Sequence, residues 1–147
     1  SGVYRIQNGK VDLLSKDVPW PNGLGFSPDE KSLIVANSDA MRRVWMRFEV
    51  KADGTLGPGA PFYTVPQDGP PGIPDGLKLD TRGNLFGTGP AGVWIISPEG
   101  KALGRIEAPE VPANVAWGDD GSTLYMTART SVYRIRLTTT GKRPCCN

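Results

Sequence analysis

The chain has 147 residues, of which 38% are hydrophobic, 22% are charged, 19 are Gly and 14 are Pro. This apolar content is typical of a globular domain and excludes an intrinsically disordered chain. The formal net charge is only +2 and no long basic block occurs, so nothing indicates a nucleic-acid partner. No apolar run approaches the roughly 18 residues that span a bilayer, and residues 1–30 lack the pattern of a signal peptide. We therefore expect a soluble protein, cytoplasmic or exported, with no membrane partner.

The absence of histidine restricts the possible chemistry. It excludes Ser/His/Asp and Cys/His nucleophilic sites and every histidine-ligated zinc or iron site. Acid–base chemistry must therefore use carboxylates, Lys or Tyr. Cys145 and Cys146 are adjacent near the end of the sequence, and this spacing suits neither a zinc site nor a loop-closing disulfide. We interpret them as part of a tail.

A strand pattern is repeated after each of three prolines, Pro21, Pro74 and Pro112. Each proline begins an alternating apolar segment, which predicts a strand, and a turn rich in Asp, Asn, Ser or Gly follows it. Two further strands are predicted in each unit, at residues 33–36 and 44–50, 85–86 and 92–96, and 124–126 and 131–137. Units of about 40 residues with short strands are typical of propeller blades. No segment keeps a helical period long enough to predict a helix.

The two ends of the repeat are incomplete. Residues 2–6 and 10–14 match the third and fourth strands of a further blade, and no convincing fourth strand follows residues 131–137. The sequence therefore predicts an all-β chain: a partial β-propeller of about three blades of four-stranded antiparallel sheets, open at both ends. We expect a single domain over residues 1–147. Its expected parts are a blade remnant at 1–15, blades at about 16–66, 73–108 and 112–137, and a tail at 138–147.

Residues 20–29, residues 74–80 with 83–85, and residues 92–100 resemble the SMP-30/gluconolactonase family, and residues 125–128 followed by 131–135 are similar to its closing blade. The resemblance covers nearly the whole of this chain but only about the carboxy-terminal half of a family member. It implies a six-bladed propeller that hydrolyses sugar lactones with one divalent cation in its central channel. Calcium is the expected ion, and magnesium, manganese and zinc are the alternatives.

The resemblance implies that Asn22 and Asp75 are metal ligands and that Asp75 is also the catalytic base. The repeat independently places both residues at the same position of successive blades, just before the innermost strand, where side chains converge on one end of the channel. Their amide and carboxylate oxygens are hard ligands that suit calcium, magnesium or manganese. The third unit has Ala113 at this position. The family's Glu ligand and another Asn lie in the amino-terminal half, so the site needs ligands from elsewhere.

Two further residues are weaker candidates for contact with a substrate. Trp20 precedes the first proline and is the aromatic residue that we expect at the channel mouth. Asn114 matches Gly23 and Gly76 in the repeat, which favours a backbone-bonding role at the start of a strand over a ligand role. The other three tryptophans lie within predicted strands, so we expect them in the core between blades.

Two other functions are compatible with the pattern. Residues 73–77 with residues 83–85 would also fit an NHL-like interaction propeller without catalytic activity, and an inactive fragment is the third interpretation. Cation binding at Asn22 and Asp75 separates the enzyme from both alternatives. The expected partners are a sugar lactone and either a second copy or a complementary chain that closes the propeller. Two copies would supply roughly the number of strands in six four-stranded blades.

Overall fold

A computed structural model describes residues 1–141, which form thirteen β-strands and no helix. The strands are β1 (Val3–Gln7), β2 (Lys10–Ser15), β3 (Pro21–Phe26), β4 (Ser32–Asn37), β5 (Val44–Glu49), β6 (Ala60–Thr64), β7 (Leu77–Leu79), β8 (Leu85–Gly89), β9 (Gly92–Ile96), β10 (Ala102–Ile106), β11 (Pro112–Gly118), β12 (Thr123–Ala128) and β13 (Val132–Arg136). They form antiparallel sheets in the orders β1-β2, β3-β4-β5-β6, β7-β8-β9-β10 and β11-β12-β13. The described residues contain no helix of the length and hydrophobicity needed to cross a membrane.

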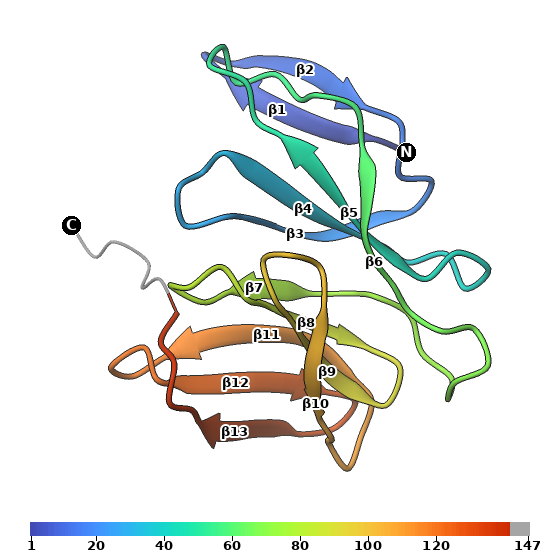
Figure 1. Ribbon diagram of the computed structural model, residues 1–147, viewed down its shortest axis with the longest axis vertical. Coiled ribbons are helices and arrows are strands. Elements are labelled where there is room, and N and C mark those ends of the chain that lie inside the picture. The colour runs from blue at the N-terminus through green and yellow to red at the C-terminus, as the bar shows by residue number, and fades with distance from the viewer. Residues whose placement is uncertain (142–147) are drawn as a thin grey trace.

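The four sheets follow one another in chain order and do not close into a ring (Figure 1). The β1-β2 hairpin lies at one end and the β11-β12-β13 sheet at the other. The expected partial propeller, open at both ends, is therefore confirmed. We refer to the four sheets, in chain order, as the hairpin and blades 1, 2 and 3.

The core consists of three apolar clusters, each between two consecutive sheets. Strand β4 shows how the sequence produces this arrangement, because successive side chains of a strand point to opposite faces. Leu33 and Val35 pack toward the hairpin, whereas Ile34 and Ala36 pack toward blade 2. A strand that is covered on both faces is mostly apolar, and β4 is buried along nearly its whole length.

The tryptophans predicted between blades lie there. Trp45 of β5 is fully buried and belongs to the cluster between blades 1 and 2. Its indole lies so close to β8 that a Cβ at Gly87 would be 2.8 Å from the ring. Trp94 lies 5.7 Å from Tyr63 of blade 1, between ring centroids. Trp117 packs in the cluster between blades 2 and 3.

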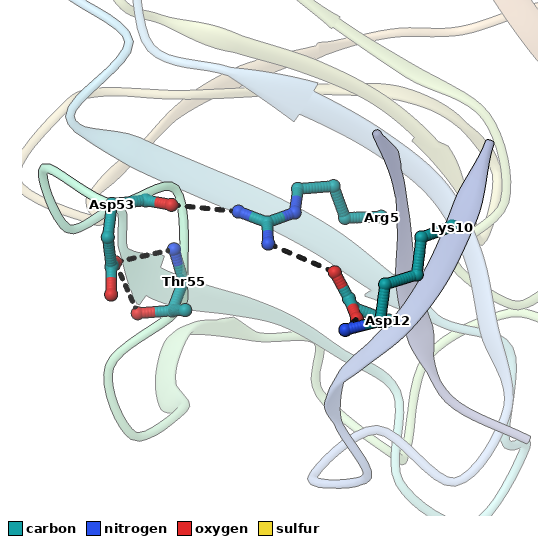
Figure 2. A network of polar contacts seen from close by, with 5 residues as sticks. All are labelled: Arg5, Lys10, Asp12, Asp53 and Thr55. Carbon is teal, nitrogen blue, oxygen red and sulfur yellow. Dashed lines mark hydrogen bonds and ion pairs between the residues drawn. The ribbon is translucent and has the colours of Figure 1, made fainter. Parts of the chain in front are cut away.

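Polar contacts attach the hairpin to blade 1 (Figure 2). Arg5 donates from Nη1 to the carbonyl oxygen of Asp53 at 2.8 Å and from Nη2 to Asp12 at 3.1 Å. Lys10 forms a second ion pair with Asp12 at 3.1 Å, and Thr55 holds the Asp53 carboxylate from within the same turn. The hydrogen bonds from Arg5 and Lys10 lower the pKa of Asp12. One guanidinium thus joins the two-stranded hairpin to the turn that follows β5.

Residues 138–141, the described part of the predicted tail, lie against blades 2 and 3. The carbonyl oxygen of Thr140 accepts a hydrogen bond from the Thr81 N–H at 2.8 Å, and the Gly141 N–H donates to Gly121 at 2.9 Å. A Cβ at Gly141 would lie 1.9 Å from the ring of Trp117, so only glycine fits at this position. Cys145 and Cys146, which were also assigned to the tail, lie outside the described residues.

Replacing Trp45 by Ala tests the packing between blades 1 and 2. The substitution removes a fully buried ring, and we expect the free energy of unfolding to fall by about 3–5 kcal/mol, as for other large core side chains replaced by Ala. Urea denaturation followed by circular dichroism measures this change. The control is Trp20→Ala, because Trp20 is 62% exposed and its loss should cost less than about 0.5 kcal/mol. Equal losses in the two variants would contradict the assignment of Trp45 to the core.

Candidate functional site

The first strands of the three blades, β3, β7 and β11, lie beside one another (Figure 1). They approach so closely at their starts that glycine is required. A Cβ at Gly23 would lie 2.3 Å from the carbonyl oxygen of Asp75, and a Cβ at Gly76 would lie 2.1 Å from Oδ1 of Asn114. The Gly76 N–H also donates to the carbonyl oxygen of Ala113 at 2.9 Å. Equivalent positions of the repeat therefore meet in space.

This close approach brings Asn22 and Asp75 together. Asn22 is the second residue of β3, and Asp75 lies two residues before β7. The Asn22 side chain lies close enough to the Asp75 carboxyl to influence its pKa. Asn22 is exposed, whereas Asp75 is partly buried. Burial raises the pKa of the Asp75 carboxyl above its ordinary value, and the Asn22 amide partly offsets this increase.

Strand β8 holds the backbone on either side of the Asp75 carboxylate. The Asp75 N–H donates to the carbonyl oxygen of Thr88 at 3.1 Å. The Thr88 hydroxyl is fully buried and is shared between the carbonyl oxygens of Gly76, at 3.0 Å, and Ala113, at 3.1 Å. Thr88 thus connects the starts of β7 and β11, and Asp75 extends from a fixed backbone.

Asn37, the last residue of β4, supports the start of β3. Its side chain is fully buried. Its Oδ1 accepts a hydrogen bond from the Trp20 N–H at 3.0 Å, and its Nδ2 donates to the carbonyl oxygen of Arg42 at 2.8 Å. One buried amide therefore joins the segment before Asn22 to the loop that follows β4.

Ser38 lies between the two candidate ligands. Its Oγ accepts a hydrogen bond from Nδ2 of Asn22 at 3.0 Å and donates to the carbonyl oxygen of Pro74 at 2.7 Å. Neither Asn37 nor Ser38 is identified by sequence reasoning. A signal was nevertheless present, because this polar pair directly follows the predicted strand at 33–36, at the end of the blade where Asn22 lies.

The weaker candidates take different positions. Trp20 is 62% exposed and lies two residues before Asn22. Asn114 is also exposed, and its Oδ1 accepts a hydrogen bond from the N–H of Val115 at 2.8 Å, which is the backbone-bonding role expected for it. Ala113 contributes its carbonyl oxygen to Gly76 and Thr88. Blade 3 therefore supports the site through its backbone.

The donor set suits a hard cation, although it is incomplete. Asn22 and Asp75 offer amide and carboxylate oxygens, the ligand type that calcium, magnesium and manganese prefer. No Lys or Arg forms an ion pair with Asp75 within residues 1–141. Nor do three or more Cys, Asp or Glu side chains gather into a metal-binding cluster in that part of the chain. The two residues could hold a divalent cation together with ligands supplied from elsewhere.

The fold and the paired side chains define the class of protein: a β-propeller blade array with two candidate oxygen ligands at one end of its inner strands. The profile of the SMP-30/gluconolactonase/LRE-like region matches residues 1–130. The chain belongs to this family.

Three known proteins illustrate the relationship. The gluconolactonase of Zymomonas mobilis is 36% identical over 149 aligned residues, covering 96% of this chain and 42% of the relative. A gluconolactonase of Xanthomonas campestris with a solved structure is 29% identical with a TM-score of 0.82, and the match covers 92% of this chain and 44% of that protein. Regucalcin from Agrobacterium tumefaciens, described as a calcium-binding protein, has a TM-score of 0.83 at 22% identity. The match covers 96% of this chain and 54% of regucalcin. The chain thus spans about half the length of these proteins.

Replacing Asn37 by Ala tests the support of β3. The Trp20 N–H and the Arg42 carbonyl would each lose their partner, and leaving a buried polar group unsatisfied costs about 1–3 kcal/mol. We expect the free energy of unfolding to fall by at least that amount in urea denaturation. Gln7→Ala is the matched control, because Gln7 is an exposed amide on β1. An Asn37 variant as stable as the Gln7 variant would show that the buried amide does not brace the strand.

Proposed function

We propose that this chain is the part of a metal-dependent sugar lactone hydrolase that supplies Asn22 and Asp75. The observation that carries the proposal is the proximity of these two hard-ligand side chains, which lie at the starts of adjacent inner strands of a chain in the gluconolactonase family. Relatives support the substrate class. The Zymomonas mobilis protein is named a gluconolactonase, and a Haloferax volcanii protein that is 29% identical is named a pentonolactonase.

The two residues have separate roles in the proposed reaction. A bound divalent cation would polarise the lactone carbonyl. Asn22 would hold that cation through its amide oxygen. The Asp75 carboxylate would also contact the cation and would accept a proton from the water that adds to the carbonyl carbon. The ring C–O bond then breaks, the ring oxygen takes up a proton, and the hydroxy acid leaves.

The ligand chemistry sets the expected order of cations. Calcium takes six to eight oxygen ligands in flexible geometry, whereas zinc prefers nitrogen and sulfur. An amide and a carboxylate therefore favour calcium, with magnesium and manganese next and zinc last. Two protein oxygens make a weak site, so we propose that the missing half of the propeller, in the same polypeptide or in a complementary chain, or a second copy supplies the other ligands and closes the ring.

The strand positions favour the missing half of the propeller over a second copy. Strand β6 is the fourth strand of blade 1 and directly precedes β7, the inner strand of blade 2. Strand β2 directly precedes β3, the inner strand of blade 1, in the same way, so β1 and β2 occupy the third and fourth positions of a blade. Strand β13 is also the third strand of its sheet. The β1 strand of a second copy, placed beside β13, would add another third strand to that blade. The missing half of the propeller, in the same polypeptide or in a complementary chain, could instead supply the strands that each blade lacks.

Thermal unfolding with added cations tests the proposed site. A ligand that binds only the folded chain raises its stability, by about 2.7 kcal/mol at 100 times its Kd. We expect calcium to raise the Tm of the chain relative to EDTA, and both Asp75→Ala and Asn22→Ala to abolish the increase. Asp68→Ala, which removes an exposed carboxylate from the loop between β6 and β7, should keep it. A chain whose Tm no cation changes would instead favour an interaction propeller.

Lactone hydrolysis by the assembled protein tests the role of Asp75 as the base. General-base catalysis contributes about 100- to 10,000-fold to a rate, so Asp75→Asn is expected to lower kcat by that factor while Asp68→Asn leaves it unchanged. Acid release from an aldonolactone, followed with a pH indicator, gives the rate. Unchanged hydrolysis in the Asp75→Asn variant would remove that role from Asp75.

A further inference from the structure

We propose that Ser38 is a positioning residue, which orients the Asn22 amide so that its oxygen faces the cation. This inference rests on the proposed function, because it concerns the same site. It starts from two hydrogen bonds of one hydroxyl: Ser38 Oγ lies 3.0 Å from Nδ2 of Asn22 and 2.7 Å from the carbonyl oxygen of Pro74. The hydroxyl therefore touches one candidate ligand and the backbone directly before the other.

The chemistry of the three partners fixes the direction of each bond. A carbonyl oxygen only accepts hydrogen bonds, so the contact with Pro74 uses the single hydrogen of the Ser38 hydroxyl. The Ser38 oxygen can then only accept, and Asn22 must present its Nδ2 to it. The Asp75 carboxylate, when ionised, is also an acceptor only, so Asn22 can donate to it only from the same amide nitrogen. The amide nitrogen is thus directed to Ser38 and lies on the side of the Asp75 carboxylate, and Oδ1 is left for a ligand.

The position of Ser38 is itself well determined. Its N–H donates to the carbonyl oxygen of Trp20 at 2.9 Å, and it directly follows Asn37, which is fully buried. The hydroxyl also connects blade 1, which carries Asn22, to the segment of blade 2 that carries Asp75. Ser38 thus sets both the orientation of the amide and its distance from the carboxylate.

Loss of the hydroxyl has a specific consequence for the amide. Without an acceptor at Ser38, one hydrogen of Nδ2 loses its partner, and the amide can turn to present Nδ2 instead of Oδ1 to a cation. An N–H group repels a cation, so only one of the two amide orientations binds it. Partners that orient a metal ligand typically contribute about 10- to 100-fold in metal affinity.

Calorimetric titration of the full chain with calcium and manganese tests this role. We expect Ser38→Ala to weaken cation binding about 10- to 100-fold, and Ser38→Thr, which keeps the hydroxyl, to restore most of the affinity. Ser27→Ala is the matched control, because the Ser27 hydroxyl makes hydrogen bonds in the turn between β3 and β4, at the opposite end of β3. It should leave the affinity unchanged. Thermal unfolding without cation shows whether each variant is folded.

An Asn22→Asp background separates amide orientation from a general loss of structure. Both oxygens of a carboxylate can bind a cation, so there is no amide to orient, and Ser38→Ala should have little effect on affinity in this background. An equal loss in both backgrounds would overturn the inference. So would a Ser38→Ala chain that binds cation as the unaltered chain does, while Asp75→Ala does not bind. If the unaltered chain binds no cation, this inference fails, whereas the proposed function, in which further ligands complete the site, is decided separately by the effect of Asp75→Asn on hydrolysis by the assembled protein.

Discussion

The site depends on how closely the first strands of neighbouring blades approach one another. At Gly23 and Gly76 the adjacent strand occupies the space that a Cβ would fill, so an Ala at either position would push two blades apart. Because the backbones meet at these glycines, the residue directly before each glycine lies at the same end of the array. Asn22 and Asp75 are those residues, and their proximity follows from the two glycines. The spacing of the candidate ligands is therefore a property of the backbone packing.

Side chains at the ends of the second strands then hold this arrangement. Asn37 and Thr88 lie in β4 and β8, and both are fully buried. Each bonds to the backbone near a candidate ligand, because buried polar groups need hydrogen-bond partners and the start of the first strand provides them. Ser38 adds the direct contact with Asn22. The second strands thus contribute to the site without presenting a ligand, and they restrict the positions that the ligand-bearing segments can take.

The fold could be predicted because its signals are local and repeated. Residues 33–36 are all apolar, which indicates a strand covered on both faces, and their side chains pack alternately in two of the core clusters. The proline-led repeat likewise placed Asn22 and Asp75 at equivalent positions. Ser38 could not be found in this way, because the repeat puts Pro90 and Arg129 at its position and its role depends on a carbonyl 36 residues away. Residues 138–141 show no strand pattern in the sequence. They are held against the blades by hydrogen bonds of the backbone, which leave no signal in the side-chain pattern.

The three blades contribute unequally to the site, and this decides how it would bind a cation. Blades 1 and 2 each present one oxygen-bearing side chain, whereas blade 3 presents Ala113 and supports its neighbours through a carbonyl oxygen. The oxygens of Asn22 and Asp75 thus come from two adjacent strands, on one side of the cation they would hold. Calcium takes six to eight oxygens, and the charge and number of protein ligands set its affinity. Each ligand supplied from outside these blades would therefore strengthen binding, and cation affinity would report directly on what completes the propeller.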